Sequence, residues 1–399
     1  MASSTLSKTP QDAKAPQLEQ GASLYSLAWK QFLRHPTAKV ALAVLGILYF
    51  LAAFADFIAP YPERFGDARL SFAPPTQVHW RNEAGEFVGP FVYGLRKELN
   101  LETFENDWTA DTSRIYPIEF FVRSSNPRDA YVPFPISLIP QPLRTRLGIR
   151  PTAQLRLFGV DAPGRIYLWG SDDVGGDIFG RILFGGRISL TVGIFASLVA
   201  VIIGVTLGGL AGFYGGWVDE LILRLDEALS AIPGIFLLLA LAAVFYPLGW
   251  PSSYVFTAIV VVLAFISWGG LARSIRSLVY SAKEQEYAFA AKALGANNWR
   301  IIFKHLVPQT LSYIVVVISL AIPSYILTEA ILSFYGLGIQ RPSTSWGLML
   351  SDAQRFVGVA GLGYRWWIYL PGLFIFISVL AWNLLGDGLR DAFDPRSRD

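Results

Sequence analysis

The residue types that carry most protein chemistry are scarce and scattered in this sequence. It contains no cysteine, which excludes disulfides, thiolate metal ligands and a cysteine nucleophile. Its three histidines, His35, His79 and His305, are far apart along the chain. It has no Gly-Lys dipeptide, and therefore no phosphate-binding loop of the Walker A type. These residue types predict a chain without catalytic residues, a metal site or a nucleotide site of its own.

One polar segment does have a spacing that could work on a partner protein: residues 286–308, EYAFAAKALGANNWRIIFKHLVP. Within it, Tyr287, Ala290, Ala291 and Leu294 recur at i, i+3, i+4 and i+7, and so share one face of a helix. Because two alanines lie at its centre, this face suits close docking into a groove. A helix on the membrane surface is the alternative, although that use favours bulkier anchors and more basic residues.

The ends of this predicted helix carry stop and start signals. Glu286 opens it, and Gly295 is placed to end it as a C′ glycine. Asn297 or Asn298 can then cap a second helix, WRIIFKHL, which leads to Pro308. We therefore expect a helix, a tight turn and a second helix.

Long apolar runs surround this segment and must position it. Hydrophobic residues make up 53% of the 399 positions and charged residues 16%, with a mean hydropathy of +0.42. A soluble domain has about 25% charged residues. A bilayer core of ~30 Å needs about 20 apolar residues in a helix, which pairs every backbone polar group internally. The sequence therefore predicts an all-α polytopic membrane protein with six transmembrane helices, over residues 40–59, 188–213, about 229–246, about 254–271, 311–332 and 366–385.

Lysine and arginine in the short connections predict the orientation of these helices. Six of them follow the fourth run, and none lies in the turn between the third and fourth. Both termini and the connection at 273–308 are therefore expected in the cytoplasm. We predict a partly disordered N-terminal segment at 1–37, a first transmembrane helix at 38–59, a membrane core at 188–386 and a cytoplasmic tail at 387–399.

Residues 60–187 are different in character. They carry 15 basic and 15 acidic residues and are numerous enough for a small domain. The runs IYPIEFFVR, AQLRLFGV and RIYLWGS predict short strands. We expect an extracytoplasmic inserted domain with some β structure, and favour a packed cap over a dedicated substrate site.

Three residues within the expected spans are candidates for gating. Glu329 near the outer end of the fifth span is an intramembrane carboxylate and so a functional-site hypothesis, with helix pairing as the equal alternative. Pro323 and Pro233 interrupt helices and can mark bends, with packing as the plainer alternative. Other residues are expected to be structural: an ion pair of Asp226 or Glu227 with Arg224 or Arg273, and small-residue helix packing at Gly204, Gly208, Gly209 and Gly212.

The polar segment resembles the cytoplasmic Glu-Ala-Ala loop of permease subunits in binding-protein-dependent ABC importers. That pattern reads Glu-Ala-Ala, three residues, Gly, nine residues, then Ile-x-Leu-Pro. This sequence has Ala290-Ala291, then Gly295, then HLVP ending at Pro308, but Phe289 stands at the place of the glutamate. Glu286 is a candidate to replace that carboxylate. Five further segments resemble the second permease type of the dipeptide, oligopeptide and nickel branch: residues 54–61, 169–193, 212–234, 329–353 and 383–396.

The resemblance implies a type I ABC importer permease in the cytoplasmic (inner) membrane of a prokaryote. It implies transport of di- or oligopeptides, or of nickel chelates or oligosaccharides by the same machinery. The implied partners are a second permease in a heterodimer, two ATPase subunits that hold the ATP and magnesium, an extracytoplasmic substrate-binding protein and the lipid bilayer, but no nucleic acid. The implied docking residues for the ATPase are Glu286, Tyr287, Ala290, Ala291, Leu294, Gly295 and Asn297.

Two other classes compete with this interpretation. An ATP-independent carrier or channel should show internal repeats or buried ion-coordinating charges, and neither is clear in the sequence. An enzyme built on residues 60–187 should show a cluster of reactive side chains, and the Asp, Glu and His residues there are scattered.

Overall fold

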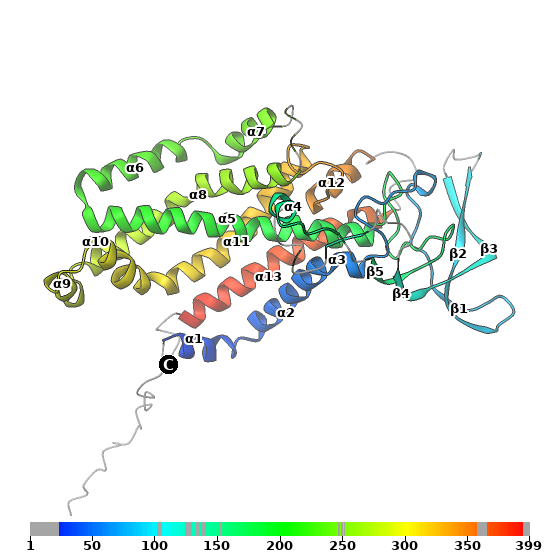
Figure 1. Ribbon diagram of the computed structural model, residues 1–399, viewed down its shortest axis with the longest axis horizontal. Helices are drawn as coiled ribbons and strands as arrows, with labels where there is room; N and C mark the ends of the chain where they lie inside the picture. Colours follow the sequence, from blue (N-terminus) through cyan, green and yellow to red (C-terminus); the bar gives the residue numbers. More distant parts are fainter. Residues whose placement is uncertain are drawn as a thin grey trace, which may run out of the picture.

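The computed structural model is an elongated bundle of helices with a strand-containing region at one end (Figure 1). It describes residues 24–99, 101, 106–123, 130–132, 136, 141–151, 154–245, 248, 250, 252–356 and 365–393. The α-helices are α1 (Leu24–Phe32), α2 (Pro36–Ala53), α3 (Ala55–Ile58), α4 (Gln141–Arg146), α5 (Ile178–Tyr214), α6 (Gly216–Ser230), α7 (Gly234–Phe245), α8 (Ser252–Ala282), α9 (Glu286–Ala293), α10 (Asn298–Arg300), α11 (Leu311–Phe334), α12 (Trp346–Gln354) and α13 (Leu370–Phe393).

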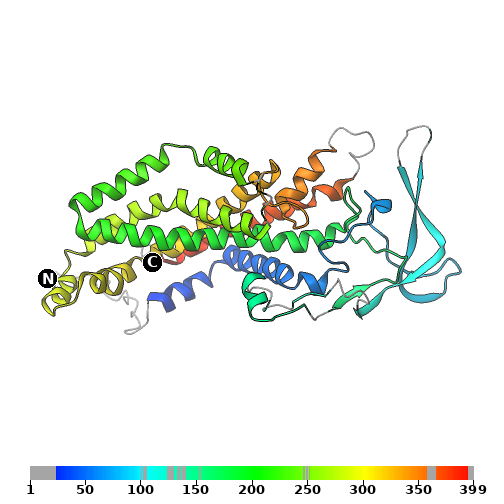
Figure 2. The same cartoon turned by 45° about the horizontal axis from the view of Figure 1, so that its top comes forward.

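Five stretches of helix are long and apolar enough to cross a membrane: Pro36–Ala53, Ile178–Tyr214, Tyr254–Ala282, Asn298–Phe334 and Trp366–Phe393. They contain or overlap five of the six expected spans, so the predicted all-α membrane fold is confirmed. The described chain begins in α1 and ends in α13, and both of these ends lie toward the end of the bundle that carries α9 (Figures 1 and 2).

The structure does not contain the single continuous helix that was expected over 229–246 as the third span. Helix α6 stops at Ser230, and α7 begins at Gly234 and has 12 residues. Pro233 separates the two helices, because it lacks an N–H and disfavours helical backbone in the residue before it. The two helices follow one another along the bundle, away from α9 (Figure 1). Pro323, in contrast, lies inside α11 and is buried.

Helices α5 and α8 approach each other through glycines. A Cβ atom at Gly204 would lie 3.0 Å from the carbonyl oxygen of Trp268, and one at Gly208 would collide with the carbonyl of Ala272. Gly212 repeats this contact one turn further on. Small residues allow such backbone contact between helices in a membrane. The predicted role of these glycines in helix packing is therefore confirmed.

The strands lie at the end of the molecule opposite α9 (Figure 2). Strands β1 (His79–Arg81), β2 (Phe87–Leu99) and β3 (Asn106–Pro117) form an antiparallel sheet in the order β1-β2-β3, and β4 (Glu119–Arg123) pairs with β5 (Leu155–Gly159). The predicted strands in IYPIEFFVR and AQLRLFGV are confirmed. The prediction for RIYLWGS is wrong, because these residues form irregular backbone with a turn at 168–169 and one isolated bridge at Ser171.

Close packing of α5 on α8 leads to a first prediction. Gly208→Ala should destabilise the protein by about 1–3 kcal/mol, because the added methyl group meets backbone that cannot move away without separating the helices. Gly46→Ala in α2 is the matched control, since a Cβ there has no heavy atom within 4 Å. Thermal unfolding in detergent measures both variants. Equal unfolding midpoints for the two would contradict this account of the interface.

Candidate functional site

The polar segment forms helix α9 at one end of the bundle, between α8 and α11. The chain reverses after α9 through a Schellman motif, in which the Gly295 N–H donates to the Lys292 carbonyl at 3.0 Å and the Ala296 N–H to the Ala291 carbonyl at 3.1 Å. Gly295 has a φ of +79°, in the left-handed region that favours glycine. The predicted C′ glycine is therefore confirmed.

A second turn of helix leads from α9 to α11. The Asn297 side chain accepts a hydrogen bond from the Arg300 N–H at 2.8 Å and caps α10, as one of the two predicted asparagines. A π-helix (η5, Ile301–Leu306) and a short 3₁₀ turn (η6, Val307–Thr310) then run into α11. π-Helical turns are rare in proteins, and many of them lie at functional sites.

The underside of α9 rests on a buried apolar cluster, which joins it to the bundle. Ala288 is 5% exposed and packs with Ile275 and Val279 of α8 and with Ile301 and Leu306 of η5, all 1% exposed or less. The cluster therefore contains side chains from α8, α9 and the π-helix that leads into α11. Any displacement of α9 has to be shared with these neighbours, because closely packed side chains leave little space to move independently.

Helix α5 also contacts this region. A Cβ atom at Gly209 would lie 3.1 Å from a side-chain carbon of Ile302 in η5. The Asn298 amide donates to the Tyr214 hydroxyl at 3.3 Å, at the end of α5. The Lys283 ammonium lies 3.4 Å from the Phe213 carbonyl oxygen. The loop is thus held to α5 by apolar packing and by two polar contacts.

The outer side of α9 is exposed. Leu294 is 88% and Tyr287 40% exposed, Ala290 is exposed and Ala291 half-buried. Tyr287, Ala290 and Leu294 of the predicted docking residues thus lie exposed on α9, whereas Ala291 packs against the buried cluster beneath the helix. Two aromatic residues that were not among the predicted docking residues are also exposed at this end of the molecule: Phe289 at 56% and Trp299 at 55%. The signal for Phe289 was present, since it occupies the place of the glutamate in the family pattern.

Ion pairs hold α6 against the part of α8 that leads into α9. Asp226 of α6 is 3% exposed and pairs with Arg273 of α8, as predicted, and Asp219 pairs with Arg276. Glu227 instead forms an exposed pair with Arg224 within α6, at 3.1 Å.

Glu329 lies elsewhere, buried in the half of the bundle away from α9. It is 1% exposed and accepts hydrogen bonds from the hydroxyls of Ser333 at 2.7 Å and Ser189 at 3.1 Å. Ser189 of α5 in turn accepts from the backbone N–H of Trp346 at the start of α12, at 3.1 Å. Glu329 thereby connects α11, α5 and α12, and in this conformation it serves helix pairing.

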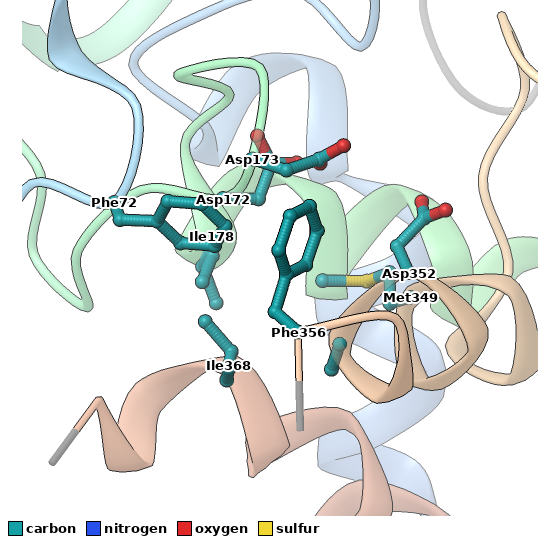
Figure 3. Close-up of a pocket in the computed structure, with 9 residues that line it drawn as sticks. Phe72, Asp172, Asp173, Ile178, Met349, Asp352, Phe356 and Ile368 are labelled. Carbon is teal, nitrogen blue, oxygen red and sulfur yellow. The ribbon is translucent and has the colours of Figure 1, made fainter. Parts of the chain in front are cut away.

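A small cavity at the end of the bundle opposite α9 is lined by the carboxylates of Asp172, Asp173 and Asp352 (Figure 3). Arg341 pairs with Asp173 at 2.6 Å and with Asp352 at 2.7 Å, and Arg181 pairs with Asp172. These arginines balance the acidic charge, and a cavity of about 20 Å³ holds little more than a water molecule. In the part of the chain that the structure describes, no three His, Asp or Glu side chains are grouped to hold a metal ion.

Fold and site together define a polytopic helical membrane protein in which an exposed surface helix connects two spans. Comparison with known families agrees with this class. Residues 204–399 match the family described as the binding-protein-dependent transport system inner membrane component. Residues 23–75 match the N-terminal transmembrane domain of oligopeptide transport permease C. The chain belongs to this family of inner membrane transport components, and the two matches leave residues 76–203 uncovered.

Individual relatives are similar over most of their length. The dipeptide transport system permease protein of Alkalihalophilus pseudofirmus is 43% identical over 239 residues, which are 60% of this chain and 75% of the relative. The glutathione transport system permease protein of Pectobacterium atrosepticum is 44% identical over 236 residues, 59% of this chain and 75% of the relative. The oligopeptide transport system permease protein of Bacillus subtilis is 40% identical over 237 residues, 59% and 74% respectively.

The pairing of α6 with α8 gives a second prediction. Arg273→Ala should destabilise the protein by about 1–3 kcal/mol, because it leaves the buried Asp226 carboxylate without its cation. Arg224→Ala is the matched control and should change stability by less than about 0.5 kcal/mol, since both side chains of that pair are more than half exposed. Unfolding in SDS measures both. A control that is destabilised as much as Arg273→Ala would show that the buried pair has no special role.

Proposed function

We propose that this chain is the translocation subunit of an ABC importer for small peptides, and that partner subunits hydrolyse the ATP. The observation that supports this proposal is the arrangement of α9. Of the residues that the structure describes, none covers the exposed side of α9, so a partner can bind there. The other side of α9 shares one buried cluster with α8 and the π-helix before α11. A partner that grips α9 can therefore act on two membrane spans at once.

The coupling follows from this geometry. When two ATPase subunits close around ATP, a docked α9 moves with them and carries the inner ends of α8 and α11. Tilting of these helices switches the solute path from one side of the membrane to the other. Two places can bend during this movement: the π-helical turn at 301–306, which leads into α11, and Pro323, which lies inside α11. Glu329, which ties α11 to α5 and α12, is proposed to hold the outer half together during this movement.

The orientation and partners are part of the proposal. The end with α9 faces the cytoplasm, because the connection that contains it is rich in lysine and arginine. Both chain termini then lie in the cytoplasm and the strand-containing region outside. A second permease completes the path as a heterodimer. An extracytoplasmic binding protein delivers the solute to the outer face of the cytoplasmic membrane of a prokaryote.

The relatives support small peptides as the solute, since they are named for dipeptides, oligopeptides and glutathione. A ligand screen of the cognate binding protein, followed by transport into vesicles that contain the whole complex, tests this choice. We expect di- or tripeptides to bind and to be transported only with ATP. Selective binding of nickel chelates or oligosaccharides would replace the peptide, and transport without ATPase subunits would contradict the proposed class.

Docking through α9 gives a third prediction. Ala290→Trp and Leu294→Glu should each reduce peptide-stimulated ATP hydrolysis by about tenfold or more, because the first adds bulk and the second a charge to the docked surface. Both side chains are exposed, so membrane insertion and thermal stability should not change. Ser281→Trp is the matched control at an exposed position at the end of α8. Hydrolysis that stays fully coupled in both α9 variants would exclude docking on this side.

A further inference from the structure

The strand-containing region has a cleft whose charge differs from that of its surroundings. It lies between the β2–β3 hairpin and two loops, at residues 67–70 and 163–165, and has a volume of about 340 Å³. Five cationic side chains but only two carboxylates line it. Residues 60–187 as a whole carry equal numbers of basic and acidic residues, so positive charge is concentrated here. We name this feature the cationic cleft; its cations are Arg69, Arg96, Lys97, Arg114 and Arg165.

Local backbone features create the cleft. The pairing of β2 with β3 shifts register between Tyr93 and Gly94, and such irregularities bend and twist a strand. Gly164 lies so close to the ring of Tyr116 that a Cβ would be 2.5 Å from it. The loop at 163–165 is therefore packed directly against β3, and this contact closes one wall of the cleft.

The two carboxylates neutralise only part of this positive charge. Asp67 is already bound by Arg69, through two hydrogen bonds of 3.0 Å, and these lower the pKa of the Asp67 carboxyl below its ordinary value. The Arg165 Nε also lies 3.8 Å from this carboxylate. Asp111 accepts its hydrogen bonds from Ser113.

Two cations of the cleft form no direct ion pair among the described residues, although Asp111 lines the same cleft as Arg114. In the described ranges, no Asp or Glu oxygen lies within ion-pair distance of Lys97 or Arg114. The Lys97 ammonium lies 5.7 Å from the ring centre of Trp108, and Arg96 pairs with the exposed Glu98, at 3.4 Å. The cationic cleft therefore presents net positive charge that an external anionic group can neutralise.

We propose that the cationic cleft docks an acidic segment of the extracytoplasmic binding protein. This inference rests on the proposed function, because that function places the strands outside the membrane and delivers the solute on a binding protein. The β2–β3 hairpin, which forms one side of the cleft, lies at the end opposite α9, where such a carrier arrives (Figure 2). The cleft also lies largely in residues 76–203, which neither family match covers, so it is an addition to the shared membrane core.

The physical effect of such a cleft is on the rate of encounter. Complementary charge at the rim of an interface steers a partner toward the productive orientation, and salt weakens this steering. A permease with this cleft should therefore capture its loaded binding protein faster at low ionic strength than one without it.

The test uses the complete transporter in lipid nanodiscs with its own binding protein. The variant R96E/K97E/R114E reverses three cations of the cleft, and R81E/R123E/R146E reverses three exposed arginines outside it. We expect the first variant to lower the association rate of the binding protein about tenfold at low salt and to flatten its salt dependence. The second should stay within about twofold of the wild type, as scattered surface charges contribute little. ATP hydrolysis without binding protein should be equal in all three.

An association rate that does not change in R96E/K97E/R114E would overturn the proposal. If the rate is unchanged and the wild type also binds inorganic phosphate or phosphatidylglycerol vesicles, and this binding is lost in the same variant, the cleft serves a free anion or a lipid headgroup instead. A wild-type complex that hydrolyses ATP with no stimulation by binding protein would instead refute the proposed function, and the cleft proposal with it.

Discussion

The backbone contact between α5 and α8 is the constraint on which the rest of the structure depends. Lipid offers no hydrophobic gain when two helices associate, so close packing has to supply the attraction. Glycines spaced four residues apart, at 204, 208 and 212, allow the two backbones to touch along three successive turns. Around this pair the other helices are placed: α6 is tied to α8 by ion pairs, and α11, α2 and α12 pack on α5.

This constraint also explains how a surface helix can govern a membrane path. Helix α9 alone has eight residues, too few to be stable without tertiary packing. It is held because Ala288 closes a cluster that α8 and the π-helix have already formed. The same contacts that stabilise α9 make it inseparable from two spans, and the small, exposed Ala290 on its other side leaves space for a partner. Stability and coupling thus come from a single packing arrangement.

Much of this arrangement could be predicted from the sequence, because it depends on local patterns. Continuous apolar runs predicted the spans, the spacing of Tyr287 to Leu294 predicted α9, and Gly295 its end. What could not be predicted depends on contacts between distant residues. The division of the third span at Pro233, the length of the β2–β3 hairpin and the joining of Glu329 to Ser189 all require knowledge of which elements are neighbours. The cationic cleft was missed for the same reason, since its cations come from β2, β3 and two loops.

The central claim is that an ATPase subunit grips the exposed side of α9. Because the chain contains no cysteine, single cysteines can be introduced one at a time, and a maleimide then labels this chain at that position alone. The most direct measurement is the labelling rate at position 290, compared with position 281 at the end of α8, with and without the ATPase subunits in the active complex. The account predicts strong protection at 290 and little at 281 when the ATPases are present. Equal labelling at 290 with and without them, in a complex that still transports, would contradict it.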